Sequence, residues 1–181
     1  STPSTNRQMS ALVFDIEATG LLRCGSFPHC IVTRDLDNPS VPLVYDDCVF
    51  GDWSIDHGLE HLADADVLIG HNIAGYDIPL LEEWKNFEFQ GQVLDTLVLS
   101  QLYYANLKDK DFDKRPMGLP PRLYGSHSLK AWGYRLHVYK GDYAEHEGAW
   151  DTYTAEMLDY CKQDTLVTLQ LYRLMARRMS E

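Results

Sequence analysis

Apolar residues recur along the chain in short runs bounded by Gly, Pro, Asp and Asn, which is typical of a protein with several strands. The first run, 11–17, is rich in apolar and β-branched residues and is followed by Gly20, so it predicts a strand that enters a turn. The Asp-Asn-Pro-Ser sequence at 37–40 favours a hairpin turn between the next two runs. The predicted strands are 11–17, 30–36, 41–45, 67–70 and a short one near 93–94.

Longer segments with apolar residues three and four positions apart predict helices between and after these strands. Ser54 is a favoured N-cap ahead of Ile55, Leu59 and Leu62, which share one helical face. The segment 106–124 is rich in Lys, Asp, Pro and Arg, and we predict that it is an exposed loop. The predicted helices are 54–65, 77–85, 96–104, 126–136 and 154–178.

The order of these elements predicts an α/β fold. Three antiparallel strands followed by alternating strands and helices indicate a mixed five-stranded sheet flanked by helices on both faces. A chain of 181 residues, 45% of them hydrophobic, is long enough for one domain with a core and too short for two. We therefore expect a flexible N-terminal tail at 1–10 and one domain at 11–181. No apolar run approaches the roughly 20 residues of a membrane span and no signal peptide is recognisable, so we expect a cytoplasmic protein with no membrane partner.

The formal net charge of −11 argues against a surface that coats nucleic acid in general. It does not exclude an enzyme that grips a few nucleotides through metal ions, because such an enzyme needs carboxylates in its cleft. Basic residues in the predicted loop are an alternative contact for phosphates, but Asp109, Asp111 and Asp113 nearly cancel their charge, which favours a solvated loop. These basic residues are Lys108, Lys110, Lys114, Arg115 and Arg122.

The four cysteines include no Cys-x-x-Cys pair, which favours reduced, partly buried thiols over a metal site. A zinc site is the weaker alternative. It would be formed by Cys24, His29, Cys30 and Cys48.

Two acids in the first predicted strand are the first candidates for chemistry. Asp15 and Glu17 are two residues apart, so they project to the same face of the strand. If that strand is central, burying both acids is costly unless a cation balances them, and ligands made only of oxygen suit magnesium or manganese. The alternative is an edge strand whose acids face water.

Asp77 follows the predicted strand 67–70 and its loop. It is a favoured N-cap for the helix that begins at Ile78-Pro79, and this is the simplest interpretation of an isolated Asp. An acid at the end of a parallel strand also points towards the cleft where such sheets bind ligands. Both roles are compatible.

Tyr160 and Asp164 are four residues apart in the last predicted helix, so they lie one turn apart on one face. Taken alone, this spacing fits an aromatic core residue beside a solvated acid. In combination with Asp15, Glu17 and Asp77 it gives a much more specific order of four acids and one tyrosine.

This order resembles the three exonuclease motifs of the DEDD superfamily. A tyrosine four residues before the last acid resembles the DEDDy branch, whereas the DEDDh branch has a histidine five residues before it, where this chain has Asp159. The segments 95–102, 106–109 and 125–136 are similar to the proofreading domain of family A DNA polymerases from T-seven-type phages. The resemblance covers nearly the whole chain from Ala11 onward, although such polymerases continue into a large polymerase domain.

The resemblance implies a ribonuclease H-like fold and hydrolysis of phosphodiester bonds at single-stranded DNA 3′ ends with two divalent ions, Mg²⁺ or Mn²⁺. It implies that Asp15, Glu17 and Asp164 hold the first metal, and that Asp15 and Asp77 serve the second. Tyr160 would orient the attacking water, because a phenol with an ordinary pKa near ~10 is a poor base at neutral pH.

The same resemblance implies where the substrate binds. The terminal nucleotide is expected at Thr19, Gly20 and Leu21, and Asn72 is expected to contact the strand, with other contacts from His127 and Lys130 at the start of their helix. A DNA polymerase domain or subunit is an expected partner, in a bacterial or phage-infected cell. An exoribonuclease of the same superfamily and a catalytically inactive binding or recruitment module are the alternatives.

Overall fold

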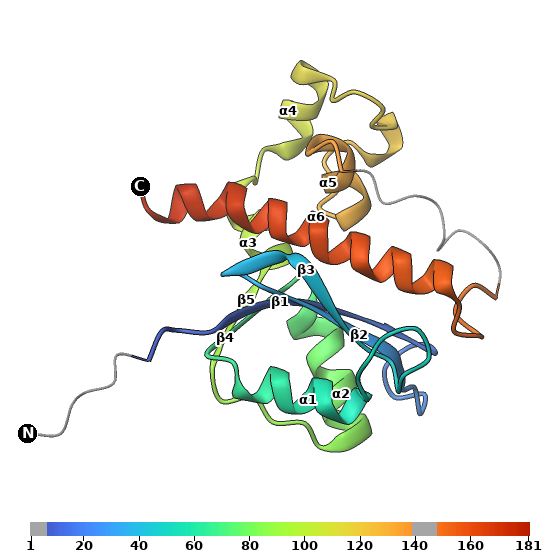
Figure 1. The fold of residues 1–181 in the computed structure, drawn as a ribbon. Coiled ribbons are helices and arrows are strands. Elements are labelled where there is room, and N and C mark those ends of the chain that lie inside the picture. Colours follow the sequence, from blue (N-terminus) through green and yellow to red (C-terminus); the bar gives the residue numbers. More distant parts are fainter. Residues whose placement is uncertain (1–6, 139–147) are drawn as a thin grey trace, which may run out of the picture.

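The computed structural model describes residues 7–138 and 148–181, which fold around a five-stranded sheet. The long helix α6 crosses one face of the sheet, and α1 and α2 cover the other (Figure 1). The elements are β1 (Ala11–Ala18), β2 (Pro28–Asp35), β3 (Asn38–Tyr45), α1 (Ile55–Asp64), β4 (Val67–Gly70), the π-helical turn η1 (Ile73–Asp77), α2 (Ile78–Lys85), β5 (Gln92–Asp95), α3 (Thr96–Tyr103), α4 (Leu107–Lys114), the 3-10 turn η2 (Pro121–Leu123), α5 (Leu129–Arg135) and α6 (Ala155–Met179).

The sheet has the order β3-β2-β1-β4-β5, so β1 is its central strand. β1 pairs antiparallel with β2 and parallel with β4, and β5 continues the parallel part. The predicted mixed five-stranded α/β sheet with helices on both faces is therefore confirmed. The alternative of an edge strand that exposes its acids to water is wrong.

The hairpin between β2 and β3 turns earlier than predicted. Asp35 pairs with Asn38, so the turn consists of Leu36 and Asp37 rather than 37–40. Pro39 is tolerated inside β3 because β3 is an edge strand, where a missing backbone N–H removes no hydrogen bond from the sheet interior.

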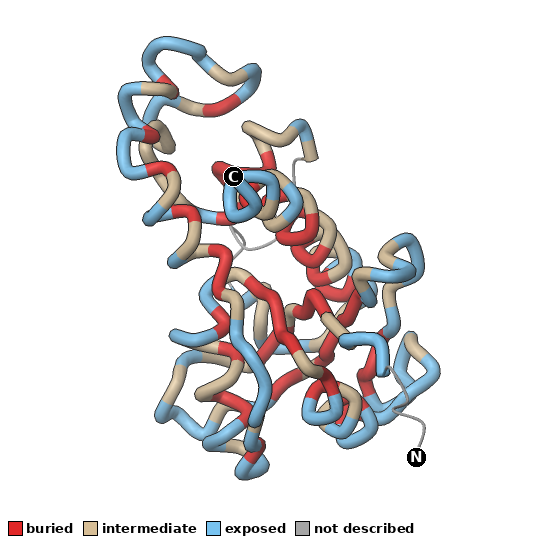
Figure 2. The backbone as a smooth tube through the Cα atoms, turned by 90° about the vertical axis from the view of Figure 1, so that its left-hand side faces the viewer, coloured by how far each residue is buried: buried red, intermediate tan, exposed pale blue. Residues whose placement is uncertain are grey.

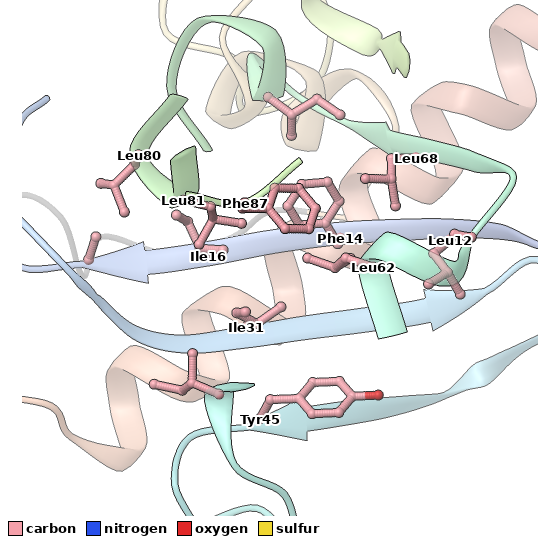
Figure 3. Close-up of a cluster of buried hydrophobic side chains, with 14 residues drawn as sticks. Leu12, Phe14, Ile16, Ile31, Tyr45, Leu62, Leu68, Leu80, Leu81 and Phe87 are labelled. Carbon is pink, nitrogen blue, oxygen red and sulfur yellow. The ribbon is translucent and has the colours of Figure 1, made fainter. Parts of the chain in front are cut away.

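The main core lies between the sheet and the helices α1 and α2. Leu12, Phe14 and Ile16 of β1 point to this side, where they meet residues such as Leu62 and Leu81 (Figure 3). Alternate residues of β1 point to the other face, and Val13 packs there against Leu169 of α6. The burial pattern in Figure 2 follows this arrangement, with buried backbone along the strands and along one side of α6.

Side-chain caps fix where several helices begin. The hydroxyl of Ser54 accepts a hydrogen bond from the His57 amide at 3.1 Å, as the sequence predicts for α1. Ser128 caps α5 in the same way, so that helix begins at Leu129, three residues later than the predicted 126–136. Thr154 caps α6, whose 25 residues agree with the predicted helix 154–178 to within one residue at each end.

The predicted exposed loop at 106–124 is wrong, because it contains α4 and η2. α4 carries few apolar residues, and a buried ion pair connects it to α5. Arg135 of α5 donates two hydrogen bonds to the Asp111 carboxylate, at 3.0 and 2.7 Å, and the Gly125 amide donates a third at 2.8 Å. The charge of Asp111 therefore neutralises that of Arg135 and is not available to balance the charges of the lysines beside it.

The beginning of the chain contacts the domain where it can be described. Residues 1–6 of the predicted flexible tail lie outside the described part. The Ser10 amide donates a hydrogen bond to the Asp66 carboxylate at 2.8 Å, and the Arg7 side chain donates one to the Asp64 carbonyl at 3.3 Å. Among the helices within 7–138 and 148–181, none is long and apolar enough to cross a membrane.

Candidate active site

Asp15 and Glu17 lie on the face of β1 that is covered by α6. Glu17 is only 5% exposed, and Asp15 is half-buried. Ligand atoms of Asp15, Glu17 and Cys161 of α6 lie within 4.8 Å of one another, which is close enough for all three to reach one metal ion. The Cys161 thiol donates to the Asp15 carboxylate at 3.5 Å, and burial raises the pKa of this thiol.

Asp164 and Tyr160 reach the same region from α6, which packs on β1. Asp164 is 7% exposed, so it is not the solvated acid of the simplest interpretation. Tyr160 is half-buried, and its ring meets the Trp150 ring edge to face, with centroids 6.0 Å apart. The four-residue spacing places both side chains on one side of α6, one turn apart.

Asp77 fills the space where β1 and β4 separate. The two strands pair in parallel only as far as Val13 and Ile69. Beyond that point the Ile16 amide donates to Asp77 Oδ1 at 3.3 Å, so the carboxylate takes the place of a strand partner. Asp77 occupies the N-cap position of α2, as predicted, but its side chain makes no cap hydrogen bond to that helix.

The four acids share one electrostatic environment. Burial, followed by the charges of Asp95 and Asp164, raises the pKa of Asp77 to about 8, although the Ile16 amide opposes this shift. The pKa of Tyr76 rises to about 12 through burial and the nearby charges of Asp77, Glu17 and Asp15. The charges that act on Asp77 and Tyr76 indicate that the four predicted acids lie near one another, although burial is the larger cause of both pKa shifts.

A small cavity of about 270 Å³ opens beside Glu17. Gly20 and Leu21, two of the predicted substrate residues, line it together with Tyr76 and Trp150. Leu21 is 74% exposed, so it is available to a ligand. The Tyr76 hydroxyl donates to the Gly20 carbonyl at 2.5 Å and holds the segment after β1 against η1.

Sequence reasoning did not identify Tyr76 and Trp150 as residues of this cavity. Tyr76 directly precedes Asp77, which is the one sequence signal that pointed to it. No local pattern marks Trp150, because only the fold brings it beside Tyr160. Thr19, by contrast, does not line the cavity: its amide and hydroxyl are hydrogen-bonded to the backbone of Phe27, at 3.1 and 3.2 Å.

Asn72 lies at the carboxyl end of β4 with a left-handed backbone (φ 61°) and an exposed side chain. Its backbone amide donates a hydrogen bond to the Asp95 carboxylate at 2.9 Å. A β-carbon at Gly75 would lie 2.5 Å from the Asn72 side-chain oxygen, so only glycine leaves room for this side chain.

His127 and Lys130 lie around the start of α5 and are both half-buried. The His127 ring pairs with the Ser100 hydroxyl at 3.0 Å, and its carbonyl meets the His71 ring at 2.9 Å. Burial and the charge of Arg135 lower the pKa of His127. Neither His127 nor Lys130 lines the cavity beside Glu17, so a substrate role for them is a prediction that rests on the sequence alone.

The weaker zinc alternative is wrong. Cys24 and Cys48 are exposed, Cys30 is buried, and the His29 ring meets the Trp150 carbonyl at 3.0 Å. Within the described residues, the group with the spacing of metal ligands is Asp15, Glu17 and Cys161.

Comparisons with solved structures identify the fold. Brucella melitensis NrnC superposes with a TM-score of 0.65 and 18% identity, over 97% of this chain and 76% of that one. The EXO domain of Aedes aegypti Nibbler gives 0.62 and 12% identity (96% and 80%), and an ssDNA complex of E. coli ExoI gives 0.58 and 14% (97% and 42%). The fold is therefore the ribonuclease H-like fold of exonucleases, as predicted.

Sequence comparison points to a narrower relation. No protein-family model matches the chain. The chain is 34% identical over 88% of its length to the DNA-directed DNA polymerases of Escherichia phage T7 and Enterobacteria phage T3. The predicted similarity to the polymerases of these phages is confirmed. The chain spans about a quarter of the length of these relatives (26%), which limits the comparison to that part of them.

Proposed function

We propose that the chain is a metal-dependent 3′→5′ exonuclease that hydrolyses phosphodiester bonds at single-stranded DNA 3′ ends and releases nucleoside monophosphates. The observation that carries this proposal is that ligand atoms of Asp15 and Glu17 lie close enough to reach one metal ion. Asp77 is hydrogen-bonded to the same strand, and the charge of Asp164 acts on it. The similarity to phage DNA polymerases and the fold of exonucleases support the same chemistry.

The donor set fits divalent cations such as Mg²⁺ or Mn²⁺. Four carboxylates supply hard oxygen ligands, and three of them are buried, so their mutual repulsion is costly without a cation. A solved form of Brucella melitensis NrnC has bound Mg²⁺. We propose that Asp15, Glu17 and Asp164 hold one ion, and that Asp15 and Asp77 hold a second. Two ions in such a site stabilise the attacking and the leaving oxygens.

The remaining groups position the reactants. Tyr160 projects from the same helix as Asp164, and we infer that its hydroxyl orients the attacking water and does not act as the base. Asp77 stays anchored by the Ile16 amide, which fixes its carboxylate relative to β1. The edge-to-face contact with Trp150 restricts the Tyr160 ring, so the water would be held in one place.

The cavity beside Glu17 is the proposed place of the terminal nucleotide. Leu21 offers an exposed apolar surface to a base, and Tyr76 and Trp150 add aromatic walls. Such contacts tolerate any base, as end-processing requires. We propose that the exposed Asn72 side chain contacts the strand outside this cavity. Contacts of the strand with Thr19, and further along with His127 and Lys130, are proposed from the sequence resemblance alone. A DNA polymerase domain or subunit is the proposed partner, in the cytoplasm of a bacterial or phage-infected cell.

Matched DNA and RNA oligonucleotides with a 5′ label test this proposal in the presence of Mn²⁺. We expect stepwise shortening of single-stranded DNA and release of mononucleotides. Faster shortening of RNA would replace the DNA assignment with an exoribonuclease. No shortening of either polymer, under conditions where a related nuclease cuts, would leave a binding or recruitment module and would overturn the enzymatic function.

A further inference from the structure

The helices α4 and α5 lie on the side of α6 opposite the sheet (Figure 1). A second groove lies between these helices and α6. Its volume is about 610 Å³. The C-terminal end of α6 forms one wall, and α4 and α5 form the others. Its apolar lining consists of Tyr104, Leu107, Pro116, Trp132, Leu136 and Leu174.

Basic side chains surround this lining, and we call the site the basic groove. Lys110, Lys114, Arg177 and Arg178 all line it. Within 7–138 and 148–181, no ion pair joins any of these four side chains to a carboxylate. Two acids also line the groove. Asp111 is buried and already neutralised by Arg135, and the exposed Glu181 leaves positive charge in excess.

Two of the cations are held in place by an aromatic ring. Lys110 Nζ lies 5.2 Å from the centroid of the Tyr104 ring, and the Arg178 guanidinium lies 4.6 Å from it. Arg178 also donates to the Tyr103 carbonyl at 3.0 Å. A concentration of positive charge in a protein of net charge −11 is therefore built into the packing of α4 and α6.

A cleft in which positive charge exceeds negative charge concentrates anionic ligands. Several cations spaced along a groove fit a chain of phosphates better than a single small anion. The aromatic residues Tyr104 and Trp132 are buried, so they offer no face on which bases stack, and recognition here would not depend on base sequence.

We propose that the basic groove is a second contact for single-stranded DNA, and that it binds phosphates several nucleotides away from the 3′ end. This inference rests on the proposed function, because it assumes that the 3′ end of the same DNA strand lies at the four acids. Arg178 follows Asp164 by about four turns of α6, which corresponds to about 21 Å. At about 3.4 Å per nucleotide in a stacked strand, this distance corresponds to roughly six nucleotides.

The experiment measures how the affinity for a fluorescently labelled 20-nucleotide DNA depends on salt, by anisotropy in EDTA, where the strand is not cut. The test variant is Lys114→Gln/Arg177→Gln, which removes two exposed groove cations whose side chains form no hydrogen bond or ion pair within residues 7–138 and 148–181. The matched control is Lys108→Gln/Arg173→Gln, which changes the same charges on the same two helices outside the groove. Thermal unfolding checks that both variants are folded.

For single strands, each phosphate contact contributes about 0.7 to the slope of log affinity against log salt. We expect the slope of the groove variant to be smaller than that of the wild type by about 1.4, with a loss of affinity on the order of tenfold at 0.1 M salt. The control variant is expected to keep a slope near that of the wild type.

Equal slopes for the groove and control variants would overturn the proposal. Binding of a polyglutamate peptide that is lost in the groove variant, with DNA affinity unchanged, would also overturn it and assign the groove to an acidic protein segment. Cleavage assays in Mn²⁺ distinguish failure of the groove proposal from failure of the proposed exonuclease function. A wild type that binds DNA through the groove but releases no nucleotide would contradict the exonuclease assignment alone.

Discussion

The ion pair between Asp111 and Arg135 makes a quantitative prediction about stability. Its side chains are only 3% and 7% exposed, and the two hydrogen bonds between them are 3.0 and 2.7 Å long. Asp111→Ala removes the carboxylate and leaves the guanidinium buried with the Ser126 and Leu123 carbonyls and the Trp132 ring as its partners. Breaking one side of a buried pair costs about 3–5 kcal/mol.

Thermal unfolding followed by circular dichroism measures this cost. In a domain of this size, 1 kcal/mol corresponds to roughly 2–4 °C in Tm, so Asp111→Ala should lower Tm by about 6–20 °C. Asp113→Ala is the matched control, because Asp113 is exposed on the same helix, and it should change stability by less than about 0.5 kcal/mol. Adding Arg135→Met to Asp111→Ala should restore part of the loss, because no buried charge is then left without its partner.

Equal Tm values for Asp111→Ala and Asp113→Ala would refute this reasoning. They would mean that water reaches Arg135 in solution, and that α4 is not anchored by the pair.

Three further predictions concern the acids and the tyrosine. Asp15→Ala should abolish nucleotide release, and it should leave the metal-free protein as stable as the wild type or more so, because it removes one of the crowded charges; retained cleavage in an oligonucleotide assay would place the active site elsewhere. Tyr160→Phe should slow release on the order of tenfold or more with unchanged Mn²⁺ affinity by calorimetry, whereas lost Mn²⁺ binding would contradict a role in orienting water. The pKa of Asp77 is raised to about 8, so the folded protein holds a proton that the unfolded chain releases near pH 4. Urea unfolding in EDTA should therefore show stability that falls as pH rises from about 4 to 8, and Asp77→Asn should weaken this dependence; identical pH profiles for the two proteins would show that Asp77 is not buried as a neutral acid.

Much of the fold follows from local patterns that are visible in the sequence. The run of apolar residues in β1, the cap at Ser54 and the apolar spacing of the last helix predict elements whose bounds agree with the structure to within about a residue. Local patterns did not predict α4. This helix is connected to α5 by the contact between Asp111 and Arg135, which are 24 residues apart in the sequence. A helix stabilised by a distant ion pair leaves no apolar periodicity to detect.

In the candidate site, too, local spacing predicted some residues, and contacts between distant segments decided the others. The spacing of Asp15 and Glu17 on a strand predicted that they share a face, and β1 places them on the face covered by α6. For Asp77 the local rule suggested a helix cap, whereas the separation of β1 and β4 gives its carboxylate the Ile16 amide as a partner. Trp150 joins the site only through tertiary packing, so neither spacing nor residue type could identify it.

One continuous helix, α6, carries both Asp164 and the wall of the basic groove. An α-helix turns by about 100° per residue, so inserting a single residue between Asp164 and Arg177 would rotate one functional face away from the other without removing any side chain. Insertions of seven residues, which nearly complete two turns, would keep both faces aligned and lengthen the separation by about 10 Å. The length of this helix is thus a geometric constraint that related chains can change only in steps of whole turns.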